Sequence, residues 1–150
     1  MDFSGAIEEF QKSLGLEVSA LGKFHLTQGG LFNAIGDAFL RNTNFDFAIV
    51  NYRNALAVYQ STLGIEHSYT SSVLQSIGIA ASSTGLDKDR VIQYKNIVSE
   101  SIKIEHAAEK HIEDGAVGEA ISSYREAICN EASLLGQYHL CLLYTSDAAD

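Results

Sequence analysis

The chain has no proline and no tryptophan among its 150 residues, and it has only one methionine. An average protein of this length has about 5% proline, or about seven residues. Proline interrupts helices because it lacks the backbone N–H and clashes with the preceding turn. Its absence, together with abundant Ala, Leu, Ile, Glu and Gln, predicts an all-α protein.

Cysteine is also scarce, since only Cys129 and Cys141 are present. Two cysteines cannot form a disulfide framework, and we therefore expect a reducing, cytoplasmic location. Cys129 stands among apolar residues of a predicted helix, which favours a small core residue. A catalytic thiol would need a nearby base, and no base can be assigned from the sequence.

Basic residues are few, with 10 Lys and Arg against 19 Asp and Glu and a formal net charge of −9. This charge repels phosphate backbones and anionic lipid, so we expect neither nucleic acid nor membrane as a partner. The apolar runs are only a few residues long, and the first residues do not follow the pattern of a secretory signal. A folded, soluble chain is predicted.

A repeat runs through most of the chain. Residues 3–25 match residues 45–67 at a shift of 42, and residues 91–98 form a degenerate third copy with Tyr94 in register with Tyr52. A further copy lies 72 residues after the second. The identities of that copy are Ala48/Ala120, Ile49/Ile121, Tyr52/Tyr124, Arg53/Arg125, Ala55/Ala127, Ser61/Ser133, Leu63/Leu135, Gly64/Gly136 and His67/His139. Such self-similarity predicts a repeat architecture.

Each repeat unit is predicted to contain two helices. In the first helix, apolar residues follow helical spacing and Gly36 lies on the packing side, where a missing side chain lets a neighbouring helix approach. In the second helix, Ala48, Tyr52 and Ala55 present a small, a large and a small residue to the first. We expect these residues, and Ala120, Tyr124 and Ala127, to lie in interhelical contacts.

These residues resemble the tetratricopeptide repeat, in which a small residue of helix A meets a small, an aromatic and a small residue of helix B. Gly36 and Gly78 match the helix A position. The 42-residue period and the Leu-Gly-x-x-His link resemble the kinesin light chain-like subgroup. The resemblance implies a right-handed α-solenoid over residues 1–140, with about three and a half units and truncated at both ends.

The predicted boundaries follow the repeat. After a single helix within residues 1–26, we expect helices at 29–42 and 45–61, at 71–84 and 88–100, and at 102–114 and 117–133. The step before the last unit is 30 residues instead of 42 and omits the link. The helices on its two sides should therefore meet through a tight turn or fuse.

Five histidines raise the possibility of a metal site, but their spacing favours a structural role. His25, His67 and His139 occupy one equivalent position in three units, and repeated positions are carried apart along a solenoid instead of converging on one ion. We expect each to hydrogen-bond a helix end. No metal, cofactor, small-molecule ligand or catalytic residue is predicted, so we do not expect an enzyme.

The resemblance places the first-helix faces along a concave groove. Glu105, Glu109 and Glu113 are spaced at i, i+4 and i+8, which puts them on one stripe that is either part of a site or only a solvated surface. The residues predicted to bind a partner are Asn33, Asp37, Arg41, Gln75, Ile79, Ser82, Glu105, Glu109, Ile112 and Glu113.

Two functions remain open at this point. One is a scaffold that binds a peptide or helix of another protein in a polar to acidic groove. The other is a regulatory or positioning domain of a larger enzyme or signalling protein whose catalytic domain lies outside this sequence. Fold alone does not separate them.

Residues 141–150 can be back-translated into a string that resembles a transposase adapter used in sequencing libraries. We interpret them as a non-native tail, the alternative being a natural polar tail. Deleting residues 141–150 should leave the thermal unfolding midpoint unchanged within error. A large drop in the midpoint would instead show that these residues pack against the fold.

Overall fold

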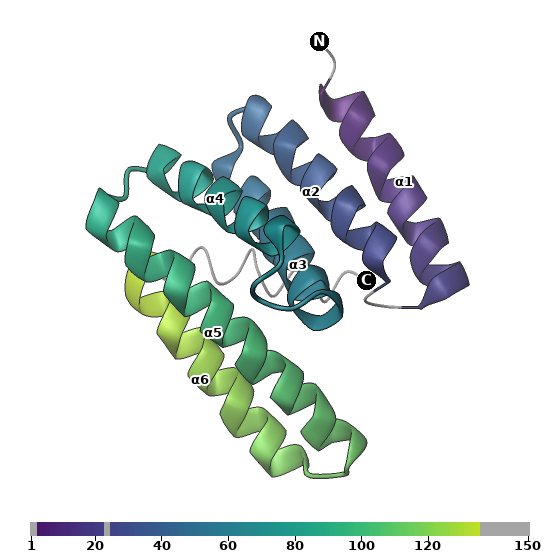
Figure 1. The fold of residues 1–150 in the computed structure, drawn as a ribbon, viewed down its shortest axis with the longest axis vertical. Coiled ribbons are helices and arrows are strands. Elements are labelled where there is room, and N and C mark those ends of the chain that lie inside the picture. Colours follow the sequence, from purple (N-terminus) through teal and green to yellow (C-terminus); the bar gives the residue numbers. More distant parts are fainter. Residues whose placement is uncertain (1–2, 23–24, 136–150) are drawn as a thin grey trace. The chain divides into compact units, whose positions relative to one another are not determined.

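The computed structural model describes residues 3–22 and 25–135 (Figure 1). These residues form six α-helices and no strand, which confirms the predicted all-α class. No helix among them is long and apolar enough to cross a membrane. The helices are α1 (Phe3–Leu21), α2 (Leu26–Arg41), α3 (Phe45–Thr62), α4 (Ser68–Ser83), α5 (Lys88–Glu113) and α6 (Val117–Leu135).

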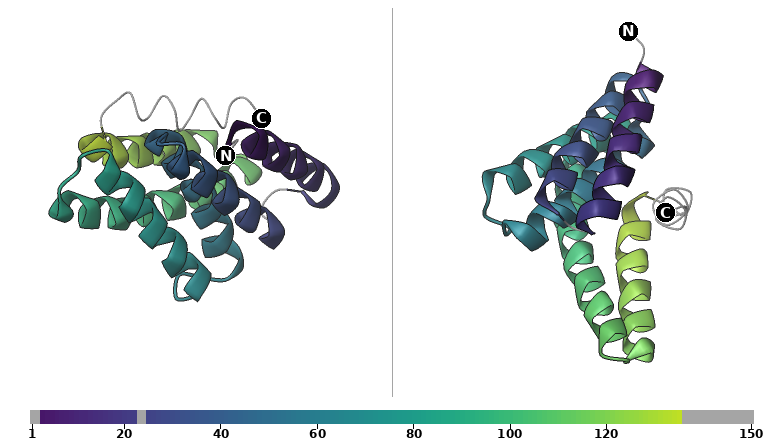
Figure 2. Two further views of the ribbon diagram at one scale, coloured as in Figure 1. Left: turned by 90° about the horizontal axis from the view of Figure 1, so that it is seen from above. Right: turned by 90° about the vertical axis from the view of Figure 1, so that its right-hand side faces the viewer.

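The helices divide between two compact units, which are described separately below. The first unit, residues 1–87, contains α1 to α4, and each of these helices packs on its neighbour in sequence. The second unit, residues 88–150, contains the helical hairpin of α5 and α6, which run side by side (Figure 2).

Two tyrosine rings of α3 sit against two glycines of α2. A Cβ atom at Gly36 would lie 2.6 Å from Cδ1 of Tyr52, and a Cβ atom at Gly29 would clash with the ring of Tyr59. The two glycines are seven residues apart, as are the two tyrosines, so the contacts repeat after two helical turns of the antiparallel pair. Glycine is required at both positions because any side chain would displace a ring.

The small-large-small pattern of α3 forms the centre of the first unit, as predicted. Ala48, Tyr52 and Ala55 are each 0% exposed. At the outer side of α2, Ile7 of α1 is buried with Ile35 and Ala38. The apolar face of α1 is therefore covered by α2.

The links before α2 and α4 share one set of hydrogen bonds. His25 and His67 are the N-cap residues, and their Nδ1 atoms accept hydrogen bonds from the backbone N–H of Thr27 and Tyr69. The expected capping role of these two histidines is thus confirmed. The predicted helix starts at 29 and 71 were three residues late, because the caps begin the helices at Leu26 and Ser68.

The same links each begin with a glycine in the left-handed region, Gly22 at φ +79° and Gly64 at φ +89°. A buried residue six positions later donates a side-chain hydrogen bond to each glycine carbonyl. Gln28 Nε2 is the donor to Gly22, and Thr70 Oγ1 is the donor to Gly64 at 2.8 Å. The glycine and the histidine of the Leu-Gly-x-x-His motif, with a donor three residues after the histidine, therefore share one set of interactions in both links.

The predicted helix pair at 71–84 and 88–100 is not observed as one compact unit. The predicted helices at 88–100 and 102–114 are fused into α5, which has 26 residues and belongs to a different unit from α4. Ser101 and Ile102 at the junction are buried, and no link motif interrupts the chain there. Of the two outcomes predicted for this step, a tight turn or fusion, the fusion is confirmed, and the described ranges contain six helices.

The described residues leave part of the sequence prediction untested. His139 and the predicted tail at 141–150 lie outside them. Within them, the all-α class and the packing of sequence neighbours are established.

The Gly36 contact can be tested by adding one methyl group. Gly36→Ala should be less stable than Gly15→Ala by about 1–3 kcal/mol in the free energy of unfolding, because the new Cβ must displace the Tyr52 ring. Gly15 is the matched control, since it is a helical glycine with no neighbouring atom within 4 Å of an added Cβ. Both variants gain helix propensity, so equal stabilities in urea denaturation would contradict the close packing.

Candidate functional site

Six of the predicted partner-binding residues lie on α2 and α4 of the first unit. Both helices pack on α3, and this packing fixes which side of α2 and of α4 faces outward. Asp37 and Arg41 of α2 are exposed, and Asn33 is half-buried. On α4, Gln75 and Ser82 are exposed, and Ile79 is 58% exposed.

Asp37 is held by a hydrogen bond from α3. The Tyr52 hydroxyl donates to Asp37 Oδ1 at 2.6 Å, although the tyrosine itself is 0% exposed. Burial raises the pKa of Tyr52 well above its ordinary value, and the hydrogen bond to Asp37 raises this pKa further. The hydroxyl therefore remains a proton donor at neutral pH, and the carboxylate is the acceptor.

Asn33 lies one turn before Asp37 on the same helix. Its Oδ1 atom is buried and has no hydrogen-bond partner among the described residues. An unpaired buried acceptor lowers stability by the free energy of its lost hydration, and most buried polar atoms avoid this state. The α2 face thus carries one fixed carboxylate and one amide oxygen without a partner.

The other four predicted residues lie on α5 of the second unit. Because α5 is continuous through this region, Glu105, Glu109 and Glu113 follow each other along one helix. Glu109 Oε2 lies 3.7 Å from His106 Nδ1, a contact that is an ion pair only when the imidazole is protonated. Ile112 is 50% exposed in the same region. The two sets of predicted residues therefore belong to separate units.

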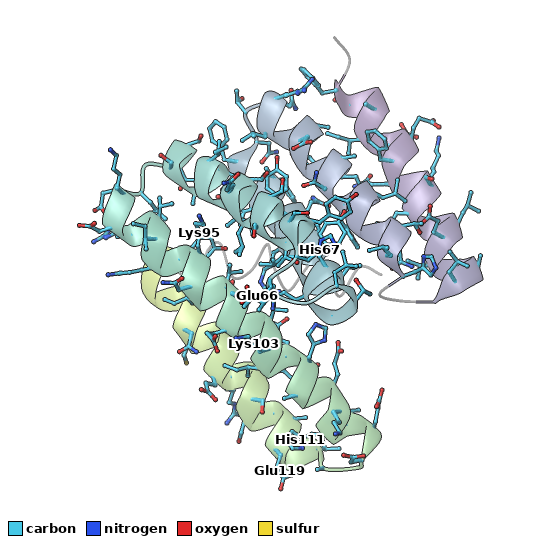
Figure 3. All side chains as sticks on the ribbon, in the orientation of Figure 1. Glu66, His67, Lys95, Lys103, His111 and Glu119 are labelled. Atoms are coloured by element: carbon cyan, nitrogen blue, oxygen red, sulfur yellow. The ribbon has the colours of Figure 1, made fainter. Side chains whose placement is uncertain are left out.

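His25, His67 and His111 stand at or near helix ends. Figure 3 shows His67 at the link before α4, where it caps the helix, and His111 near the turn that follows α5. No three His, Cys, Asp or Glu side chains of the described residues are grouped so that they could hold a metal ion.

The prediction that Cys129 is a core residue was wrong, because its side chain is exposed. The buried face of α6 contains Ala120, Ala127 and Glu131. Cys129 is two residues from Ala127, or about 200° around the helix, and so points away from that face.

Sequence reasoning missed that Tyr52 contacts a predicted site residue. The repeat pattern identified this tyrosine as a packing residue. Packing alone does not show which group the hydroxyl contacts. The available signal was the chemistry of the side chain, since the hydroxyl of a buried tyrosine usually finds a hydrogen-bond partner. Asp37 directly follows Gly36, the residue against which the ring packs.

The α2 face offers an amide, a carboxylate and a guanidinium group, and the α4 face offers an amide and a hydroxyl group on either side of the exposed Ile79. This set can bind a peptide through hydrogen bonds and one apolar contact. Comparison with protein-family models, with curated proteins and with solved structures gives no match for the chain.

The capping role of His67 predicts a specific pair of variants. His67→Ala should lower the free energy of unfolding by about 0.5–2 kcal/mol, because the N–H of Tyr69 loses its acceptor. His67→Asn should retain most of the stability, because asparagine is a good N-cap residue. Denaturation with and without added zinc checks both points. Equal losses in the two variants, or stabilisation by zinc that requires His67, would contradict the role.

Proposed function

We propose that this chain is a protein-interaction scaffold built as a right-handed, tetratricopeptide-like α-solenoid. The surface proposed to bind a peptide or helix of another protein consists of the outer faces of α2 and α4, called the α2/α4 surface below. Support comes from the internal repeat and the Gly36–Tyr52 contact. The proposal assigns the chain to the cytoplasm, with no cofactor and no catalytic residue.

The observation that carries the proposal is the exposure of Ile79 among polar residues. Ile79 is 58% exposed near the middle of α4, with exposed Gln75 and Ser82 on either side. Scattered exposed apolar residues are common on protein surfaces. Ile79 differs from the other exposed apolar residues in its position. Its helix, α4, packs on α3, and so does α2, which carries Asp37 and Arg41. An apolar anchor bordered by polar groups is the usual composition of a peptide-binding surface.

The charge of the chain favours a basic partner segment. The net charge is −9, and Asp37 supplies a carboxylate on the α2/α4 surface. Complementary charge mainly raises the encounter rate and the specificity. Exposed charge pairs contribute only about 0–1 kcal/mol each, so apolar side chains of the partner must supply much of the affinity. We therefore propose a partner with Lys or Arg beside apolar residues.

The carboxylates of α5 extend the proposal to the second unit. Glu105, Glu109 and Glu113 would attract a basic segment of a partner to α5, and Ile112 would give an apolar contact on that helix. The contribution of α5 is tested separately from that of the α2/α4 surface, because the two surfaces belong to different units.

A peptide-array screen followed by titration tests this proposal. The captured peptides should combine basic and apolar residues, and Ile79→Ser should weaken the binding of the tightest peptide about tenfold by removing the anchor. Ile92→Ser is the matched control, because Ile92 is 59% exposed but lies on α5, outside the proposed residues. Capture of acidic peptides only, or equal loss in the two variants, would contradict the proposal.

A second titration tests the contribution of α5. A triple Glu105/Glu109/Glu113→Gln variant should bind the basic peptide more weakly, and the difference from the unchanged chain should shrink as salt is added. Equal affinity at low salt would remove α5 from the proposal and leave the α2/α4 surface within it.

A further inference from the structure

The Tyr52–Asp37 hydrogen bond connects the core of the first unit to the α2/α4 surface. Tyr52 is 0% exposed, whereas Asp37 is exposed on α2. The hydroxyl of the buried residue reaches Asp37 Oδ1 at 2.6 Å. The orientation of a surface carboxylate is thus set by a residue that no partner can touch.

The tyrosine ring cannot easily move to follow the carboxylate. On one side it lies against Gly36, where an added Cβ would be 2.6 Å from the ring. On its own helix it stands between Ala48 and Ala55, each 0% exposed. A close-packed ring in a full core holds its hydroxyl at one position.

Without this hydrogen bond, the Asp37 carboxylate could pair with Arg41. Arg41 follows Asp37 at i+4, and Asp–Arg pairs at this spacing form ion pairs on helix surfaces. In the described residues, however, no ion pair joins Asp37 to Arg41. The tyrosine hydroxyl therefore binds one oxygen of the carboxylate, Oδ1, while the charge of Arg41 acts on the same hydroxyl from nearby.

We infer that Tyr52 is a positioning residue of the α2/α4 surface: its hydroxyl keeps Asp37 apart from Arg41 and available to a Lys or Arg side chain of the partner. The inference rests on the proposed function for the identity of the partner. The hydrogen bond itself does not depend on that function. Tyr52 acts only through Asp37, since it makes no contact with solvent.

The test uses Tyr52→Phe, which removes the hydroxyl and keeps the ring against Gly36. The probe is the tightest basic and apolar peptide from the array. Tyr52→Phe should weaken its binding about two- to fivefold, the range of one exposed charge pair. Adding Arg41→Gln to Tyr52→Phe should restore part of the affinity, because Asp37 then has no intrahelical competitor. In an Asp37→Asn background, Tyr52→Phe should have no further effect.

A second readout follows Asp37 without any partner. The NMR couplings of its Cβ protons should show one side-chain rotamer in the unchanged chain and a different or averaged rotamer in Tyr52→Phe. A purely structural role for Tyr52 would shift the unfolding midpoint and leave this rotamer unchanged. Tyr59→Phe is the matched control, because Tyr59 packs on Gly29 in the same way but does not bond Asp37.

The outcomes separate the two ideas. If the rotamer changes but no peptide binds the unchanged chain, the proposed function and the role of Tyr52 in binding both fail, while the positioning of Asp37 stands. If peptides bind the unchanged chain and Tyr52→Phe binds them equally well, the inference fails and the proposed function survives. The same conclusion follows if Tyr52→Phe weakens binding by the same factor with Asp37 present and in the Asp37→Asn background.

Discussion

The packing of two tyrosine rings on two glycines is the contact on which the first unit depends. Gly29 and Gly36 leave room on α2 for Tyr59 and Tyr52, so α2 and α3 approach as closely as a backbone and a ring allow. Glycine lowers helix propensity by about 1 kcal/mol relative to alanine, and the two contacts provide the compensating close packing. The position of α2 then fixes Asp37 beside the Tyr52 hydroxyl. The position of Asp37 on the α2/α4 surface therefore depends on the packing of α2 against α3 in the core.

The links give the same unit its regular spacing. A left-handed glycine and a capping histidine recur before α2 and α4, and a buried side-chain donor recurs in the first turn of each helix, all at positions that differ by 42 residues. Each link satisfies backbone groups that a helix start would otherwise leave without partners. The link motif is absent within α5, and there the chain continues as one helix of 26 residues.

Sequence reasoning predicted the features that repeat and missed those that depend on a single contact. The all-α class, the buried Ala48–Tyr52–Ala55 pattern and the histidine caps follow from residues that recur at equal spacing. The Gly29–Tyr59 contact was missed because Gly29 does not recur, since Ser71 stands 42 residues later. The Tyr52–Asp37 hydrogen bond and the exposure of Cys129 depend on rotamers and helix rotation, which hydrophobic periodicity does not fix.

The most direct measurement of the central claim is the NMR environment of the α2 glycines. If the rings of Tyr52 and Tyr59 pack on the backbone, the Hα protons of Gly36 and Gly29 should be displaced from ordinary helical shifts by the ring currents. They should also show strong nuclear Overhauser effects to the tyrosine ring protons. Ordinary helical shifts at both glycines, without effects to either ring, would contradict the account, because α2 and α3 would then lack the contact that positions Asp37.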